Sequence, residues 1–200
     1  MKKTTSIVFT GDIGFDRYMD RKWEDPELLS RDVLDFFHSA DHVCANVEGA
    51  LIDAVDDGSR GVFFHSMNPE ATKVLKDIGA DIWSIGNNHT MDAGAEGIVS
   101  TRKIAADLGC KTFGAGLNEV EASEPVYLEE AGGIGMFGVS YMAECIPATA
   151  TEPGISAGTI WITSSAASRK SSPSAAGASW WPTAVRNSPA FPAPTPGTVT

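Results

Sequence analysis

Three short apolar segments of this 200-residue chain each end in a polar cluster, and stretches with helical spacing separate them. The apolar runs, with one shorter run after them, predict strands at residues 5–10, 42–45, 81–85 and 112–114. Helices are predicted at 28–40, 69–78 and 95–108, and a hairpin is predicted from 125–130 and 134–141. Strands that alternate with helices predict an α/β fold, and the late hairpin predicts a mixed sheet.

Several residues mark where these helices begin, end and face the core. Asn68 is suited to cap the second helix, Pro69 to occupy its first position, and Gly79 to follow its last turn. Gly109 is expected to close the third helix. The first helix is predicted to place an apolar face toward the core, formed by Val33, Phe36 and Phe37. The hairpin is predicted to turn through Gly132 and Gly133.

The polar clusters contain residue types that bind metal ions. Asp12 follows the first strand, Glu48 follows the second, and Asn88 and His89 follow the third. Strands of a parallel α/β sheet end at a common edge, so these loops are expected to meet there. Two carboxylates, an amide oxygen and an imidazole suit Mg²⁺ or Mn²⁺, and they also accept Zn²⁺ or Fe. The sequence therefore predicts a site for a divalent metal.

Each of these residues also has a purely structural interpretation. Asp12 fits a turn cap, and Glu48 fits a surface carboxylate. Asn87 and Asn88 fit a turn, because asparagine tolerates left-handed backbone conformations. Two asparagines directly before a histidine are less usual in a simple turn, which favours a role in the site, with Asn87 as a contact to substrate.

Neighbouring charged residues leave similar alternatives. Asp92 fits a cap of the helix that follows better than it fits a metal ligand. Arg17 is either a solvated charge or a clamp for an anionic group of the substrate. The remaining histidines are interpreted as structural or exposed: His38, His42 and His65.

Charge and cysteine content narrow the classes of function. The formal net charge of −11 argues against a nucleic-acid surface and against binding to acidic membranes, since both need clustered cations. Cys44, Cys110 and Cys145 match no zinc spacing and are expected to be reduced. Neither a signal peptide nor a membrane segment is predicted. We therefore expect a cytoplasmic protein.

The composition changes sharply near Gly158. The chain has 26 Asp and Glu residues, and none of them follows Glu152. The segment 158–200 is rich in Ser, Ala, Pro and Thr, yet it contains tryptophans, which disordered segments rarely do. We predict a domain at 1–157 and a low-complexity tail at 158–200 that is read out of frame. A genuine disordered tail is the alternative.

The frameshift can be examined by back-translation. Read two bases out of phase, Trp180-Trp181-Pro182 forces Val-Ala, and the codons that follow permit a His-Gly-Gly-x-Glu sequence. An apolar strand that ends in such a motif suits an active site. Sequencing the coding DNA across codon 158 tests this prediction, and an intact frame would contradict it.

The motifs together resemble those of the CapA family, which serves poly-γ-glutamate capsule synthesis. Phe9-Thr10-Gly11-Asp12, Arg17 and Ala45-Asn46-Val47-Glu48 are similar to the opening of that family. The segment Asn87-Asn88-His89, followed by Asp92 and Gly94, resembles its most specific signature. The resemblance covers roughly residues 5 to 155.

This resemblance implies a fold and a chemistry. The fold is the αββα sandwich of the calcineurin-like metallophosphatases, of which this chain would hold the N-terminal part. The ligands of one divalent metal ion, or of two, would be Asp12, Glu48 and Asn88, and His89 would be the acid or the phosphate contact. The substrate would be a phosphoester or an anionic polymer. One alternative is a non-catalytic role in polymer binding or assembly. Another is an inactive truncated product, because two later motifs of the family, His-x-Gly-x-Glu and Gly-His-x-His, do not occur in this chain.

Overall fold

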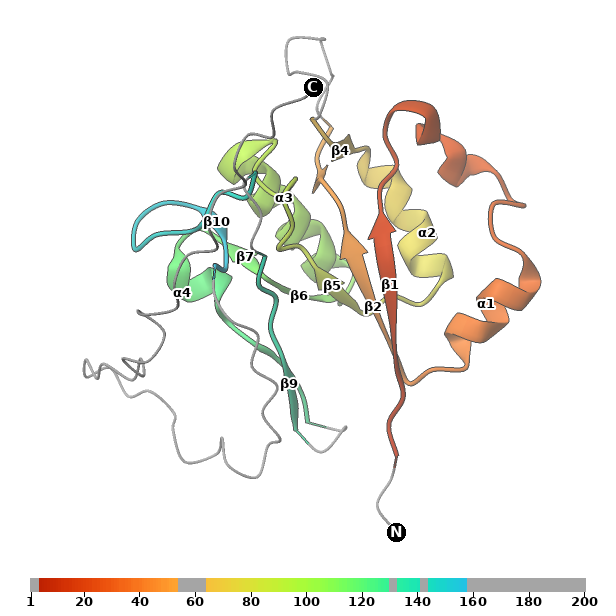
Figure 1. Cartoon of the computed structure of the whole chain (residues 1–200). Coiled ribbons are helices and arrows are strands. Elements are labelled where there is room, and N and C mark those ends of the chain that lie inside the picture. Colours follow the sequence, from red (N-terminus) through yellow and green to blue (C-terminus); the bar gives the residue numbers. More distant parts are fainter. Residues whose placement is uncertain (1–3, 54–63, 130–132, 141–143, 158–200) are drawn as a thin grey trace, which may run out of the picture. The chain divides into compact units, whose positions relative to one another are not determined.

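A four-stranded parallel sheet forms the centre of the computed structural model, which describes residues 4–53, 64–129, 133–140 and 144–157. The strand order is β1-β2-β5-β6, and every neighbouring pair is parallel. The strands are β1 (Ile7–Ile13), β2 (His42–Val47), β5 (Ile82–Ser84) and β6 (Lys111–Phe113) (Figure 1). The parallel α/β architecture predicted from the sequence is therefore confirmed.

Helices connect these strands and carry the predicted boundary residues. The α-helices are α1 (Arg31–His38), α2 (Thr72–Asp77), α3 (Gly94–Asp107) and α4 (Glu119–Ala122), and the 3-10 turns are η1 (Arg17–Met19), η2 (Lys22–Glu24) and η3 (Pro69–Ala71). The Asn68 side chain accepts a hydrogen bond from the Glu70 N–H, so the predicted cap is present, although the first turn is η3. Gly79 and Gly109 follow α2 and α3 with φ angles of 70° and 75°, as a helix C-terminus requires.

The helices pack against one face of the parallel sheet. Strands that follow one another in the sheet through right-handed crossovers place their helices on the same side. The strand residues on this face are Val43, Ala45 and Trp83. They form one core with residues of three helices: Leu34 and Phe37 from α1, Val74 and Leu75 from α2, and Ile98 and Ala105 from α3. Figure 1 shows α1 and α2 to the right of β1 and β9 to its left.

A hairpin packs on the opposite face of the sheet. It consists of β8 (Val126–Leu128) and β9 (Ile134–Met136), which pair antiparallel. Its apolar residues join Cys44, Ile82 and Phe113 in a second core, because successive side chains of a strand point to opposite faces. Helices, parallel sheet and hairpin are the layers expected of the N-terminal part of an αββα sandwich.

The predicted mixed sheet is wrong for the described residues. The hairpin forms a sheet of its own and does not extend the parallel sheet. Two further pairs are also separate: β3 (Ala50–Leu51) runs parallel to β4 (Ser66–Met67), and β7 (Ala115–Gly116) runs antiparallel to β10 (Gly154–Ile155).

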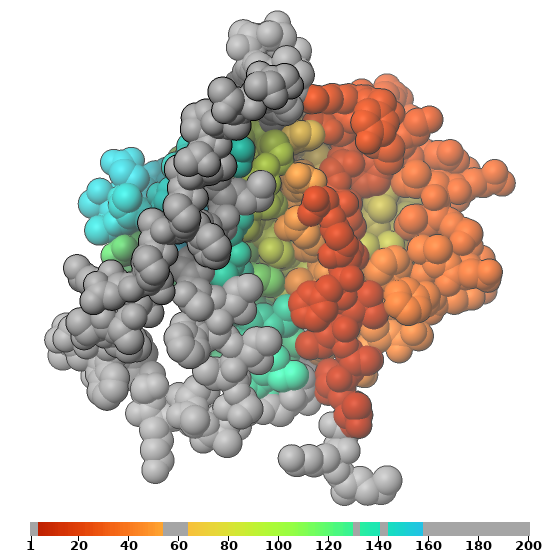
Figure 2. All heavy atoms as spheres, viewed as in Figure 1, coloured from red at the N-terminus to blue at the C-terminus, as the bar shows by residue number. Residues whose placement is uncertain are grey.

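The first strand and the first helix differ from their predictions. Asp12 does not end β1 but lies inside it, because the register with β2 shifts between Phe9 and Asp12 and pairing continues to Ile13. Figure 2 shows β1 along the surface of the molecule, and Phe9 is 64% exposed. In α1, the predicted apolar face is wrong for Val33 and Phe36, which are 39% and 59% exposed. The face that packs on the core contains Leu34 and Phe37.

Some predictions lie outside the described residues. These are the tail at 158–200, Gly132 of the hairpin turn and the end of the predicted strand at residue 141. None of the described helices combines the length and the apolar character that a bilayer crossing requires.

Candidate functional site

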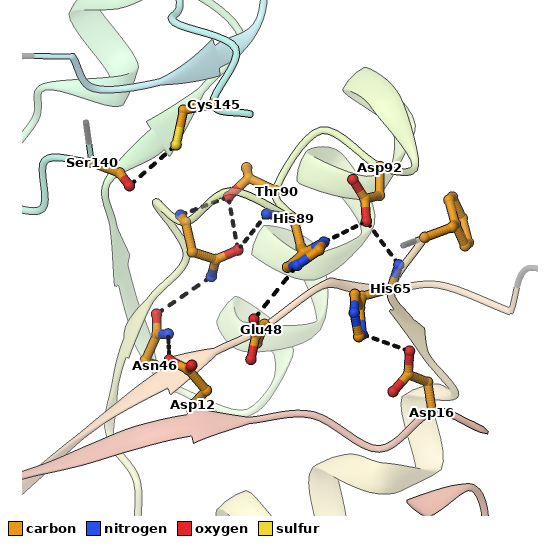
Figure 3. A network of polar contacts seen from close by, with 12 residues as sticks. Asp12, Asp16, Asn46, Glu48, His65, His89, Thr90, Asp92, Ser140 and Cys145 are labelled. Atoms are coloured by element: carbon orange, nitrogen blue, oxygen red, sulfur yellow. Dashed lines mark hydrogen bonds and ion pairs between the residues drawn. The ribbon is translucent and has the colours of Figure 1, made fainter. Parts of the chain in front are cut away.

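The ends of β1, β2 and β5 meet at one edge of the sheet, as the sequence predicts. The Glu48 N–H donates to the Ile13 carbonyl at 3.0 Å, which joins the loop after β2 to the end of β1. The Asn46 amide donates to Asp12 Oδ1 at 2.6 Å (Figure 3). The Asn87 amide donates to the Val47 carbonyl at 2.8 Å, which ties the loop after β5 to the end of β2. Three segments that are distant in sequence therefore form one site.

Asn87 fixes the loop that carries His89. Its buried side chain donates to Val47 and also, at 3.4 Å, to Asn46 Oδ1. Its Oδ1 accepts from the His89 N–H at 3.1 Å. These bonds use both donor hydrogens of the Asn87 amide and one acceptor lone pair of its oxygen. The geometry thus favours a structural role for Asn87 over the predicted contact to substrate.

His89 is held between two carboxylates. Its Nδ1 lies 2.8 Å from Asp92 Oδ2, within hydrogen-bond distance. Its Nε2 faces Glu48 Oε1 at 3.7 Å, which is too long for a direct hydrogen bond. The His89 side chain is only 13% exposed. An imidazole whose Nδ1 is occupied by a carboxylate keeps Nε2 available for proton transfer.

Glu48 sits in an environment that disfavours its negative charge. Burial raises the pKa of the Glu48 carboxyl, and the negative charge of Asp12 raises it further. The imidazoles of His89 and His65 act in the opposite direction and lower this pKa. The side chain is 23% exposed, so a small ligand can reach it. Two carboxylates that repel one another at a partly buried position form a set that a cation would stabilise.

Asp92 does not cap α3, contrary to the prediction. The N-cap position of α3 is Ala93, and no side chain makes a cap hydrogen bond there. Asp92 Oδ2 instead accepts the His65 N–H at 2.7 Å and contacts His89 Nδ1. The carboxylate therefore joins the segment before β4 to the loop after β5.

His65 and Asp16 belong to the site although the sequence did not assign them to it. The ring centroids of His65 and His89 lie 4.0 Å apart with an interplanar angle of 65°. His65 Nδ1 lies 2.7 Å from Asp16 Oδ2. That buried oxygen has no hydrogen bond of standard geometry to any described residue. Its contact with the His65 ring nitrogen takes the place of such a bond. No motif surrounds His65, and the short strand β4 that follows it carries no periodic signal.

Two further predicted residues lie at the margins of this arrangement. Asn88 is partly buried, and its side chain has no hydrogen bond to another described residue. Arg17 is exposed and donates to the Phe64 carbonyl at 3.5 Å, directly before His65. It also lines a cavity of about 290 Å³ together with Asp16. Arg17 is therefore beside the site, next to His65.

The oxygen atoms of Asp12, Glu48 and Asn88 are of the type that binds divalent ions. Their present positions are less suited to hold one. Asp12 and Glu48 supply carboxylate oxygens, and Asn88 supplies an amide oxygen. Within the described ranges, no group of three or more His, Cys, Asp or Glu side chains is already arranged to hold a metal ion. Burial of Glu48, together with the negative charge of Asp12, raises the Glu48 pKa, and this is the feature that fits a cation.

Comparison with known proteins identifies relatives of this chain. A family model described as "Bacterial capsule synthesis protein PGA_cap" matches residues 6–177. The PGA biosynthesis protein CapA of Bacillus subtilis (strain 168) is 27% identical over 132 residues, which are 64% of this chain and 35% of that protein. The matched range of the family includes every residue of the site.

Two uncharacterized proteins of Sinorhizobium fredii (strain NBRC 101917 / NGR234), y4sH and y4uA, are similar to the chain as well. Each is 29% identical over 107 residues, which are 51% of this chain and 23% of the relative. The matches thus span about a quarter to a third of the length of these three relatives.

Proposed function

The chain belongs to the family described as bacterial capsule synthesis protein PGA_cap, and on that premise we propose that its site is a metal-dependent phosphoesterase-type centre. The reaction would serve the synthesis of a surface polymer, and poly-γ-glutamate is the first candidate, since the relative CapA is a PGA biosynthesis protein. The substrate would be a phosphoester linked to that polymer or to its assembly.

The observation that carries this proposal is the position of His89 between Asp92 and Glu48. Asp92 occupies Nδ1 at 2.8 Å, and Nε2 faces the Glu48 carboxylate across 3.7 Å. A general acid needs a proton on an atom that faces the reacting group and a partner that fixes its ring. In the proposed reaction, His89 acts as the imidazolium: its Nδ1–H is held by Asp92, and its Nε2 carries the proton that the leaving oxygen receives.

The carboxylates would hold the metal. Asp12 and Glu48 would bind one divalent ion, or two, with Asn88 as a further oxygen ligand, and Mn²⁺, Mg²⁺, Zn²⁺ or Fe suit such a set. A bound ion of this kind polarises a phosphoryl group and makes its bound water more acidic. Arg17, beside the site, would bind the anionic part of the substrate that lies away from the reacting bond.

Metal binding tests the proposal directly. Isothermal titration of Mn²⁺ into the purified chain is expected to show saturable binding that Asp12→Asn and Glu48→Gln each weaken. His42→Gln is the matched control, because His42 lies 2.7 Å from Asp81 in a similar His–Asp pair outside the site. Binding that is absent, or equally strong in all variants, would contradict a metal centre at these residues.

A binding or assembly role for an anionic polymer is the competing function, and the same variants separate the two. In that role, Arg17 and the site loops would contact carboxylates of the polymer without turnover. Binding of poly-γ-glutamate that survives Glu48→Gln and His89→Asn, in a chain that hydrolyses no phosphoester, would favour this function over catalysis.

A further inference from the structure

His65 contacts the predicted catalytic imidazole through both its backbone and its ring. The His65 N–H donates to Asp92 Oδ2 at 2.7 Å, which is the oxygen that also contacts His89 Nδ1. The His65 ring meets the His89 ring edge to face, with centroids 4.0 Å apart. Figure 3 shows the two rings next to each other, with Asp92 above both histidines and Asp16 beyond the His65 ring.

The far side of the His65 ring is also fixed. Asp16 Oδ2 lies 2.7 Å from His65 Nδ1, and the two side chains are 20% and 26% exposed. Asp16 comes from the segment that follows β1, and His65 precedes β4, so this contact joins two parts of the site. The ring of His65 is therefore held by a carboxylate on one side and by an imidazole on the other.

We propose that His65 is a positioning residue for His89. Its ring, backed by Asp16, limits the rotation of the His89 ring, and its N–H fixes the Asp92 carboxylate that occupies Nδ1. Together these contacts keep His89 Nε2 directed at Glu48. The inference deepens the proposed function and rests on it for the role of His89.

Comparison with the other histidines of the chain shows which contact of His65 is unusual. His42 also pairs with a carboxylate, Asp81, at 2.7 Å, and His38 Nε2 lies 2.7 Å from the Asp77 carbonyl. Within the described ranges, His65 and His89 form the single recorded contact between two histidine rings. A His–Asp pair alone is thus ordinary in this fold, and the ring contact to His89 distinguishes His65.

A pair of variants separates ring packing from general damage. His65→Ala removes the ring, whereas His65→Phe combined with Asp16→Asn keeps a flat ring and avoids leaving a buried carboxylate without its partner. In the Mn²⁺-loaded protein, His65→Ala is expected to lower kcat for p-nitrophenyl phosphate about 10- to 100-fold, because a misplaced catalytic group costs rates of this order. KM should change little, and the double variant should recover most of kcat.

Nuclear magnetic resonance of the imidazole nitrogens provides a readout that needs no turnover. In the wild-type chain, neutral His89 is expected in the tautomer with its proton on Nδ1, facing Asp92. His65→Ala should give a mixture of His89 tautomers, the double variant should restore the single tautomer, and His42→Gln should leave it unchanged.

The outcomes distinguish this inference from the proposed function. A single wild-type-like tautomer in His65→Ala would overturn the inference, and so would a double variant that behaves like His65→Ala in both measurements. A tautomer mixture in His65→Ala that the double variant reverses supports the inference, even if the chain hydrolyses no phosphoester and the proposed function fails.

Discussion

The Asp92 carboxylate lies 2.8 Å from Nδ1 of His89, and this contact decides which nitrogen of the imidazole can serve chemistry. A ring nitrogen that donates to a carboxylate fixes the tautomer and the orientation of the ring. The free nitrogen, Nε2, then faces Glu48. Asp92 also accepts the His65 N–H, so one carboxylate organises two segments of the site.

The first prediction concerns the loss of this contact. In Asp92→Asn, the neutral amide no longer balances the positive charge of the imidazolium that a histidine acid requires, and its NH₂ group can displace the Nδ1–H contact. We expect kcat for p-nitrophenyl phosphate to fall about 100-fold, within the range that general acid–base catalysis contributes. KM and the melting temperature should change little. Steady-state kinetics measure the effect, and a rise in KM at constant kcat would instead assign Asp92 to substrate binding.

The second prediction concerns stability and pH at Glu48. Its pKa is raised in the folded chain, first by burial and then by Asp12. A group with a raised pKa contributes stability that is complete below its unfolded pKa and is lost as the pH rises through the folded value. In the metal-free chain, Glu48→Gln is therefore expected to raise the melting temperature at neutral pH and to have no effect under acidic conditions.

Glu121 is the control for this prediction, because its pKa is shifted in the opposite direction. The hydrogen bond from the Arg102 side chain, followed by that from the Leu117 N–H, lowers the pKa of the Glu121 carboxyl. Its contribution to stability is present above the ordinary pKa of a glutamate and is lost as the pH falls through the lowered value. Glu121→Gln should thus lower the melting temperature at neutral pH. Thermal melts that shift in the same direction for both variants would contradict the assignment.

The sequence was sufficient to predict that these strand ends meet at one edge of the sheet. Asp12 lies near the end of β1, and Glu48 and His89 follow β2 and β5, which are its successive neighbours in the sheet. A parallel sheet brings such strand ends together regardless of loop detail. The helix limits at Asn68 and Gly79 were also predictable, because they depend on local backbone chemistry.

Contacts between distant segments were not predictable in the same way. His65 and Asp16 meet across the fold, and neither belongs to a local motif that indicates the other. Asp92 is a residue type that commonly caps helices and directly precedes the N-cap residue of α3, yet its carboxylate contacts His65 and His89 instead. Tertiary contacts therefore outweighed the local preference. In α1, the predicted face was right for Phe37 and wrong for Val33 and Phe36, because Leu34 packs on the core together with Phe37.

The third prediction concerns the loop that carries the asparagines and His89. Gly86 begins this loop, and a Cβ atom placed on it would clash with the backbone of Gly114, including its carbonyl oxygen. Backbone atoms cannot move aside as a flexible side chain does, so Gly86→Ala should lower the free energy of unfolding by about 1–3 kcal/mol, as overpacking does. Chemical denaturation measures this change.

Gly11 provides the matched control for this substitution. It lies near the same edge of the sheet, and a Cβ atom on it would meet no heavy atom within 4 Å. Gly11→Ala should leave the free energy of unfolding nearly unchanged. Equal losses in the two variants would show that the approach of Gly86 to Gly114 does not limit the loop.

The central claim is that the residues at this sheet edge form a metal-dependent phosphoesterase centre with His89 as the acid. The most direct measurement is the release of phosphate from p-nitrophenyl phosphate by the metal-free chain before and after addition of Mn²⁺, in wild type and in His89→Asn. The account predicts turnover that requires Mn²⁺ and that falls about 10²- to 10⁴-fold in the variant. Turnover that is independent of Mn²⁺, or that is equal in wild type and variant, would contradict it.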